Sequence, residues 1–176
     1  MILRPQTCSG KENPSFVGFR QAHLKGSAAV SLSFTAAAAN EKAGLLIFQN
    51  ETNFYLLCQS IDNGRPVIQL YKGPGNAHAT GEPELLASKS IGNMPKGQKL
   101  KIAANGSSYS FYYSDEGGQW ALLKGNVDAK FLSTASAGGF TGCMYAMYAT
   151  SSGKPSFNKA RFNWFEYRGD DDVYKK

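Results

Sequence analysis

The sequence predicts an all-β protein, a two-sheet antiparallel β-sandwich. Short runs rich in Val, Ile, Phe, Tyr, Leu and Thr recur along the 176 residues, and several alternate apolar with small polar side chains. Turn residues separate these runs, among them 19 glycines and 7 prolines that follow no period. Helical patterns are almost absent. These observations indicate about eleven short strands joined by turns, which is typical of a sandwich or barrel.

The expected strands follow one another along the whole chain. In the run A-A-V-S-L-S-F at residues 28–34, apolar side chains alternate with small ones, as in a half-buried strand. The dipeptide Asn105-Gly106 gives the strongest hairpin signal, because both residues accept a positive φ at low cost. Among the expected strands are 16–24, 28–34, 43–49, 53–60, 67–71, 99–104, 108–114, 120–124, 139–148 and 160–167.

Two stretches do not fit the strand pattern. Residues 35–42 have helical propensity, but they lie between two strand runs and are too short to form a stable helix alone. Residues 72–84 contain Gly73-Pro74-Gly75 and Glu82-Pro83 and predict a loop, and long loops on rigid sandwiches often contact partners. We therefore expect a single domain over 1–176, with its core at about 14–167, an N-terminal lead-in at 1–13 and a charged tail at 168–176.

Composition narrows the class of partner. Apolar residues make up 42% of the chain and support a real core, but no apolar run approaches the roughly 18 residues that span a membrane. The start of the chain lacks the apolar stretch of a signal peptide, which leaves the compartment open. The net charge of +6 is spread along the sequence, and its densest cluster, Lys96, Lys99 and Lys101, fits an ordinary strand face. We expect neither a nucleic-acid nor a membrane partner.

Residues suited to catalysis are few. The two histidines, His23 and His78, lie in no nucleophile, zinc or phosphate-binding motif. A glycosidase needs two carboxylates across the sugar bond, and only Glu51 and Glu166 lie in or beside strongly apolar strands. We therefore expect no activity from the chain alone, and keep an independent glycosidase or lyase as an alternative.

No cofactor is expected. Cys8, Cys58 and Cys143 are far apart in the sequence and are expected to be buried hydrophobic residues, with one disulfide between two of them as the alternative. A structural calcium ion would need several carboxylate oxygens, and the weak candidates are Asp170, Asp171 and Asp172 in the tail. A solvated charged end is the favoured interpretation of that tail.

Aromatic and amide side chains are abundant on the expected strands, and they suit a sugar ligand. Pyranose C–H faces pack on aromatic rings, and sugar hydroxyls need amide, carboxylate or guanidinium partners. The polar triple Gln49, Asn50 and Glu51 ends a nearly continuous apolar strand, where it can either cap a turn or bind a ligand. The candidate sugar-contact residues are Arg20, Gln21, His23, Gln49, Asn50, Glu51, Tyr55, Gln69, Tyr71 and Trp120.

Five motifs in this order carry a family resemblance. They are P-S-F-V-G-F-R-Q-A-H-L (14–24), A-G-L-L-I-F-Q-N-E-T-N-F-Y (43–55), V-I-Q-L-Y (67–71), Y-S-F-Y-Y-S (109–114) and A-R-F-N-W-F-E-Y (160–167). From about Pro14 to Tyr167 the chain resembles the C-terminal concanavalin A-like β-sandwich domain of family 43 glycoside hydrolases, the β-xylosidase and α-L-arabinofuranosidase group.

The resemblance implies a noncatalytic accessory module with a jelly-roll fold. In that family the catalytic carboxylates lie on a separate N-terminal five-bladed propeller, and the appended sandwich is treated as a module for xylan or related β-linked polysaccharide. The alternative that the family implies is a structural domain, which packs on the propeller and shapes its active-site rim without binding sugar alone. The expected partners are therefore xylan or xylo-oligosaccharide and an N-terminal catalytic domain.

Two positions depart from the family pattern. Phe19 stands where a second arginine or another polar residue is common, which weakens transfer of a binding or docking role to the R-Q-A-H stretch. Asn163 stands where an aspartate is common, which weakens the case for a cation there.

Overall fold

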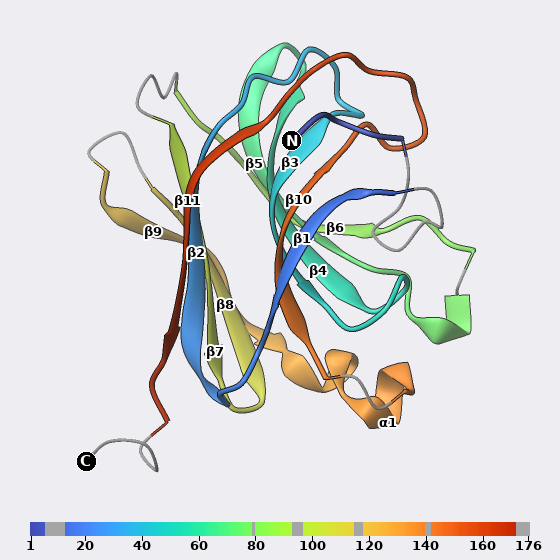
Figure 1. The fold of residues 1–176 in the computed structure, drawn as a ribbon, viewed down its shortest axis with the longest axis vertical. Coiled ribbons are helices and arrows are strands. Elements are labelled where there is room, and N and C mark those ends of the chain that lie inside the picture. Colours follow the sequence, from blue (N-terminus) through green and yellow to red (C-terminus); the bar gives the residue numbers. More distant parts are fainter. Residues whose placement is uncertain (6–12, 79, 93–96, 115–117, 140–141, 172–176) are drawn as a thin grey trace.

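A computed structural model gives the fold of residues 1–5, 13–78, 80–92, 97–114, 118–139 and 142–171. Two antiparallel sheets lie face to face, and almost all of the regular structure is strand (Figure 1). This confirms the predicted all-β, two-sheet sandwich.

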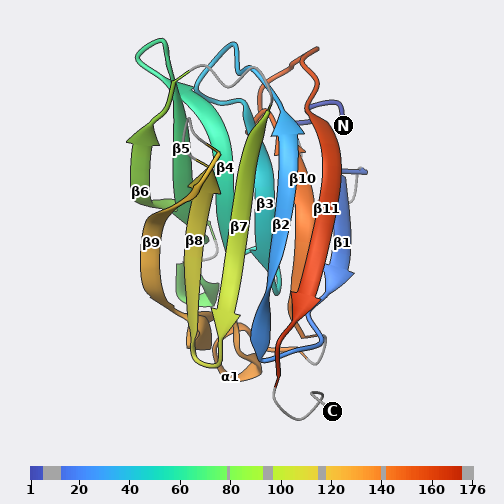
Figure 2. The ribbon, with the colours of Figure 1, turned by 90° about the vertical axis from the view of Figure 1, so that its left-hand side faces the viewer.

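The larger sheet has six strands and the smaller one five. The larger sheet has the order β1 (Ser15–Arg20), β10 (Met144–Thr150), β3 (Lys42–Phe48), β4 (Phe54–Asp62), β5 (Arg65–Lys72) and β6 (Glu84–Ser90). The smaller sheet has the order β11 (Arg161–Gly169), β2 (Lys25–Ser33), β7 (Gln98–Asn105), β8 (Ser108–Ser114) and β9 (Trp120–Asp128). The edge strands β1 and β11 lie on the same side of the sandwich (Figure 2).

The core lies between the sheets and follows from strand alternation. Leu45 and Ile47 of β3 share one buried cluster with Val30 of β2, Leu100 of β7 and Phe111 of β8. Fully burying a side chain of this size stabilises the fold by about 1.5–3 kcal/mol relative to leaving it exposed. The predicted alternation at residues 28–34 is therefore that of a strand with one face toward this core.

Residues 35–41 form no helix, in agreement with the expectation that this stretch is too short for a stable one. The connections differ from the sequence expectation in two places. Strand β6 was not expected, since E-L-L-A-S-K-S has little apolar alternation and lies mostly exposed. After β9 the chain forms two short unpredicted helices, η2 (Ala129–Leu132) and α1 (Thr134–Ala137). The predicted loop between β5 and β6 is present and contains one turn of 3-10 helix, η1 (Asn76–His78).

The first residues of the chain join the fold. Ile2 and Arg4 form isolated bridges to Lys159 and Thr150, and Leu3 is buried in the core. The part expected as a lead-in thus contributes a core side chain. In the described part of the chain, no helix is long and apolar enough to cross a membrane.

A buried carboxylate fastens the connection between β10 and β11. Glu41 accepts hydrogen bonds from Ser156 Oγ at 2.6 Å, from Asn158 Nδ2 at 2.8 Å and from the Ala37 backbone N–H at 2.7 Å. Burial raises the pKa of Glu41, but these hydrogen bonds outweigh it and leave the pKa below its ordinary value of 4.5. Glu41 therefore holds this connection as an ionised acceptor.

Candidate functional site

The outer face of the six-stranded sheet is apolar at its centre. Leu46, Phe54, Leu56, Cys58 and Tyr148 form a second buried cluster there, separate from the core between the sheets. Antiparallel sheets with one solvated face normally carry polar side chains on it. An apolar outer face of this kind indicates a surface that is recessed for a ligand or covered by other chain.

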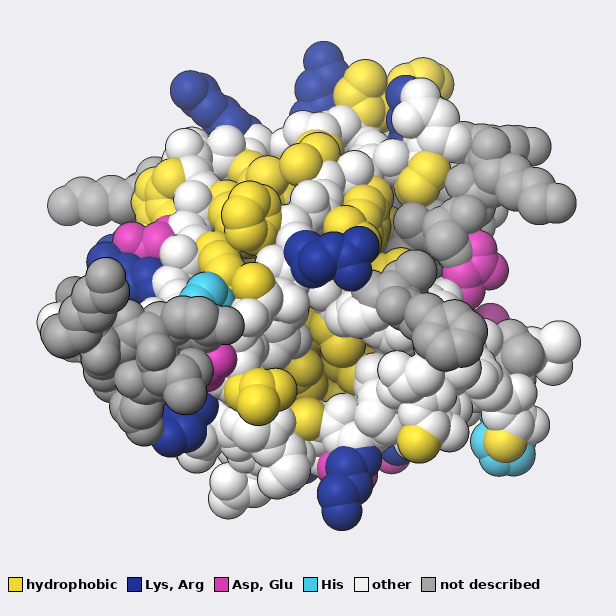
Figure 3. Space-filling model, turned by 60° about the horizontal axis from the view of Figure 1, so that its bottom comes forward, with side chains coloured by type: hydrophobic (Ala, Val, Ile, Leu, Met, Phe, Trp, Pro, Cys, Tyr) yellow, Lys and Arg dark blue, Asp and Glu magenta, His cyan; other side chains and the backbone are white. Residues whose placement is uncertain are grey.

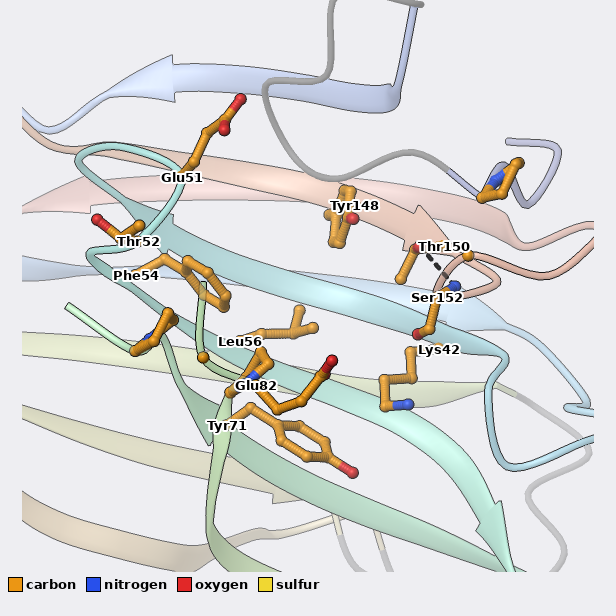
Figure 4. Close-up of a pocket in the computed structure, with 15 residues that line it drawn as sticks. Lys42, Glu51, Thr52, Phe54, Leu56, Tyr71, Glu82, Tyr148, Thr150 and Ser152 are labelled. Carbon is orange, nitrogen blue, oxygen red and sulfur yellow. Dashed lines mark hydrogen bonds between the residues drawn. The ribbon is translucent and has the colours of Figure 1, made fainter. Parts of the chain in front are cut away.

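A hollow of about 490 Å³ opens above this cluster. It is lined from the sheet side by Phe54 and Leu56 of β4, Tyr71 of β5 and Tyr148 of β10, as Figure 4 shows. The residues outside the strands that line its sides are Pro5, Glu51, Thr52, Pro74, Gly81, Glu82, Pro83, Ser152 and Gly153. The hollow is thus a recess between the sheet and the connections that rise above it.

Polar groups stand around this apolar base. The Lys42 ammonium lies 5.3 Å from the centre of the Tyr71 ring and donates a hydrogen bond to the Ala39 carbonyl at 3.0 Å. Two carboxylates, Glu51 and Glu82, also line the hollow, and Figure 4 shows the Glu82 side chain reaching into it. Rings below and charged groups at the margin are the two kinds of partner that a sugar needs.

Tyr71 has a fixed hydroxyl. It donates a hydrogen bond to Gln69 Oε1 at 3.0 Å. Burial is the main reason that the pKa of Tyr71 is raised to about 12, and the nearby Cys58 and Asp62 add smaller electrostatic contributions. The Tyr71 hydroxyl therefore stays protonated at neutral pH. Three candidates from the sequence, Glu51, Gln69 and Tyr71, therefore lie at or beside this hollow.

Gln49 and Asn50 are used within the fold. Asn50 Oδ1 accepts from the backbone N–H groups of Thr52 and Asn53 at 3.0 and 2.7 Å, and its amide donates to the Ala137 carbonyl at 2.9 Å. The Gln49 amide is 3.5 Å from the Gly138 carbonyl. These contacts support the turn-capping interpretation for Asn50, whereas among the described residues the Gln49 side chain hydrogen-bonds only to the residue that ends α1. Together the two side chains fasten α1 to the β3–β4 turn.

Arg20, Gln21 and His23 lie at the end of the sandwich where β1 turns into β2. Gln21 donates to the His23 carbonyl at 3.0 Å and accepts from the Tyr109 hydroxyl at 3.0 Å. His23 Nδ1 lies 2.8 Å from the Tyr167 hydroxyl. This group joins the two sheets at their end and does not line the hollow.

Two further candidates lie away from the hollow. Tyr55 is only 1% exposed, and its hydroxyl donates to the Asp128 carbonyl at 2.9 Å inside the sandwich. Trp120 is on β9, in the opposite sheet. The candidate sugar-contact residues therefore do not share one face, because alternation identifies neighbours on a strand but does not say which side meets solvent.

Four further residues that line the hollow were not among the candidates from the sequence: Lys42, Phe54, Glu82 and Tyr148. One signal could have found the hydrophobic part. Strand β4 begins F-Y-L-L-C without alternation, and its residues are buried on both faces. Such runs mark a strand covered on each side, which would have placed Phe54 and Leu56 opposite Tyr55.

The sequence also raised two uses for carboxylates, glycoside hydrolysis and calcium binding. The described residues do not bring the carboxylates considered for either use together at one site. Glu51 lines the hollow whereas Glu166 lies on β11 of the other sheet, so these two carboxylates do not face each other. Asp171 accepts from the Lys25 and Leu24 backbone N–H groups at 2.5 and 3.0 Å, and these hydrogen bonds lower its pKa. Among the described residues there is no group of three or more His, Cys, Asp or Glu that could hold a metal ion. Asp172 lies outside them.

The cysteines agree with the sequence expectation where they are described. Cys58 and Cys143 are free, the first buried and the second half-buried. Burial raises the pKa of the Cys58 thiol to about 12, which makes it unreactive. Cys8 lies outside the described residues.

Two antiparallel sheets, with a recess on the outer face of the larger one, define a concanavalin A-like sandwich. The sequence profile of the beta-xylosidase C-terminal concanavalin A-like domain matches residues 1–168, and the chain belongs to this family. The resemblance seen in the sequence motifs is thereby confirmed, and the chain corresponds to an accessory domain of family 43 glycoside hydrolases.

Curated relatives are longer enzymes. A non-reducing end alpha-L-arabinofuranosidase of Bacteroides ovatus is 30% identical over 158 residues, which are 89% of this chain and 28% of that protein. A xylosidase/arabinosidase of Butyrivibrio fibrisolvens is 30% identical over 163 residues, 93% of this chain and 30% of that protein. The chain therefore spans somewhat under a third of the length of these relatives.

Solved structures show the same relation. The Bacteroides ovatus xyloglucan PUL GH43B protein superposes with a TM-score of 0.84 at 26% identity, covering 96% of this chain and 32% of that one. The GH43 protein BlXynB of Bacillus licheniformis, in a K247S mutant, gives a TM-score of 0.81 at 26% identity, with 97% and 32% covered. The sandwich thus recurs as one part of larger family 43 proteins.

Proposed function

We propose that this chain is a noncatalytic module that holds xylan or a related β-linked polysaccharide in the hollow on the six-stranded sheet. The carrying observation is the hollow itself, with the rings of Phe54, Tyr71 and Tyr148 at its base and the carboxylates of Glu51 and Glu82 at its margin. Family membership supports the ligand class, because the relatives are named as xylosidases and arabinofuranosidases.

The contacts follow from the side chains present. A pyranose ring packs its C–H face on the Tyr71 or Tyr148 ring, and its hydroxyls donate to the Glu82 carboxylate and accept from the Lys42 ammonium. The hollow is open, so much of the sugar stays hydrated and the affinity is weak, with a Kd on the order of 1 mM.

Calorimetric titration with neutral xylohexaose tests this function. The unchanged chain is expected to bind, and Tyr71→Ala to bind about threefold to tenfold more weakly, since one aromatic contact contributes roughly 0.5–1.5 kcal/mol. Phe157→Ala is the matched control: that ring is 97% exposed and does not line the hollow, so its loss should leave affinity unchanged. Absence of binding by the unchanged chain, or equal loss in both variants, would refute the proposal.

A second candidate function is packing against the catalytic propeller of a longer enzyme. Val17 and Phe19 on edge strand β1 are each 55% exposed, and Leu24 beyond it is 72% exposed. Phe19 also contacts Phe165 and Tyr167 of β11, with ring centres 6.2 and 5.5 Å apart, so hydrophobic side chains continue across the gap between the sheets.

These residues lie toward the end of the sandwich that carries Arg20, Gln21 and His23. Figure 3 shows hydrophobic side chains gathered over this end, with basic ones between them. Contiguous exposed apolar side chains mark interaction sites, and protein–protein contacts are one such kind. Co-elution of the chain with a separately produced family 43 propeller, lost on Phe19→Ser, would support this role; identical elution with and without the propeller would count against it.

A further inference from the structure

The outer face of the five-stranded sheet carries a second hollow, on the opposite side of the sandwich from the first. The five strands that build this sheet (Figure 2) hold six basic residues and two acidic ones. Because their inner face is the core, alternation turns these charged side chains outward. The basic residues are Lys25, Lys99, Lys101, Lys124, Arg161 and Arg168, and the acidic ones are Asp128 and Glu166.

Small residues and cations together shape this hollow, which encloses about 440 Å³. Ser27 of β2 pairs with Ala103 of β7 on one side and with Arg168 of β11 on the other. Because the side chains of Ser27 and Ala103 are small, the surface is hollowed there. Lys101 flanks it from β7, opposite Ala29. Among its lining residues, Lys25, Lys101 and Arg168 outnumber the single carboxylate, Asp170, so the hollow favours an anion.

An aromatic platform adjoins the hollow through Lys101. The Lys101 ammonium lies 4.6 Å from the centre of the Tyr112 ring and 4.5 Å from that of Trp120. These cation–π contacts fix the ammonium and the indole in place relative to one another. Trp120 is 40% exposed, so the ring held by Lys101 still offers surface to a ligand.

Arg168 is able to turn toward a ligand. Its guanidinium donates to Glu166 Oε1 at 2.8 Å, and both side chains are largely exposed. Exposed ion pairs contribute only about 0–1 kcal/mol. A ligand carboxylate can therefore replace Glu166 as a partner at little cost, and a guanidinium–carboxylate contact is strong and directional.

We propose that this hollow and the Trp120 platform bind an acidic polysaccharide, a uronate-substituted xylan, with carboxylates over the basic hollow and a sugar ring on the indole. Cations supply the partners for the uronate, and the exposed ring supplies the apolar contact for a pyranose face. The site goes beyond the hollow on the six-stranded sheet and does not depend on it. A nucleic acid fits less well, because its binding surfaces carry denser basic residues than three cations beside a carboxylate.

Titration with glucuronoxylan and with the same polymer after carboxyl reduction tests the proposal. We expect the acidic form to bind at least about tenfold more tightly at low salt. The preference should shrink at roughly 1 M NaCl, where the screening length falls to about 3 Å. Equal affinity for the two polymers would overturn the proposal.

Variants that remove equal charge from the two sheets test which sheet gives the preference for the acidic polymer. The double variant Lys101→Gln, Arg168→Gln should lose the preference for the acidic polymer, whereas Arg65→Gln, Lys89→Gln, which removes the same charges from the other sheet, should keep it. Tyr71→Ala, which tests the first hollow with xylohexaose, should also keep it, so the two proposals fail separately.

Two outcomes would contradict the second site. Equal loss in both double variants would show only general attraction to the basic chain. A DNA duplex would be added at a phosphate concentration equal to the carboxylate concentration of the polymer. If the duplex displaced glucuronoxylan, the surface would be a nucleic-acid site. Trp120→Ala supplies a check independent of charge, since it should weaken binding of the acidic polymer about threefold to tenfold. Circular dichroism of this variant tests that the fold is kept, because the substitution also removes one cation–π contact of Lys101.

Discussion

The two outer faces of this sandwich differ although both belong to antiparallel sheets of similar size. On the six-stranded sheet, outward residues such as Leu46, Leu56 and Cys58 are buried and form a cluster beneath a hollow. On the five-stranded sheet, outward Trp120 and Leu122 remain exposed among lysines and arginines. The outer face of the six-stranded sheet thus has the composition of a protein interior, whereas that of the five-stranded sheet has the composition of a protein surface. We therefore expect the two faces to bind different ligands.

The largest expected effect tests this contrast directly. Leu56→Ala should lower the free energy of unfolding by about 2–4 kcal/mol, because it opens a cavity in a buried cluster. Leu122→Ala removes the same atoms from an outward position that is 57% exposed, and should cost roughly 0.5 kcal/mol or less. Urea unfolding of the two variants measures both values. Similar costs would mean that the outer faces do not differ in packing.

A smaller effect sharpens the description of the hollow's margin. Glu41 holds the β10–β11 connection that includes Ser152 and Gly153, so Glu41→Gln should destabilise the protein by about 1–2 kcal/mol through weakened hydrogen bonds. Because the pKa of Glu41 is lowered in the folded state, its contribution is complete above its ordinary pKa of 4.5 and is lost as the pH falls through the lower folded value.

Thermal unfolding across this pH range checks the prediction. The stability difference between the unchanged chain and Glu41→Gln should be constant near neutrality and shrink in acid. A difference that grows on acidification would contradict an ionised, hydrogen-bonded Glu41. Glu51→Gln is the control, since Glu51 is exposed and should show little difference at any of these pH values.

The smallest expected effect concerns the other face. Lys101→Gln should lower the free energy of unfolding by roughly 0.5–1 kcal/mol, the range for a cation–π contact at a partly exposed site. Lys99→Gln, on the same strand, should cost less, because the Lys99 ammonium makes no cation–π contact with a described ring. Denaturant titration followed by tryptophan emission measures both changes, and Lys99→Gln proving the more costly would refute an anchoring role for Lys101.

Much of the fold was predictable because strands that border the core alternate apolar and polar residues along the sequence. The run at 28–34 lies largely in β2, with its apolar positions in the core. The predicted hairpin joins β7 and β8, with Asn105 ending β7 and Gly106 beginning the turn. The family followed from the motifs. By contrast, β6 was not predicted, since it lies at an edge and buries little of its surface.

The candidate site was less predictable because a strand sequence does not state which face is outward. Tyr55 and Phe54 are adjacent rings in β4, yet the first enters the core and the second lines the hollow. Asn50 and Gln21 are polar residues of the kind that binds sugars, but the fold uses them to hold turns and ends together. Only the full arrangement of strands distinguishes these uses.

The two hollows lie on opposite outer faces of the sandwich, and this placement affects how the module would interact with several polysaccharide chains at once. If each face holds its own polysaccharide strand, one molecule has two points of attachment that point in opposite directions. It would then join neighbouring fibres, and mixtures with soluble glucuronoxylan would thicken or turn cloudy at intermediate ratios and clear again in excess protein.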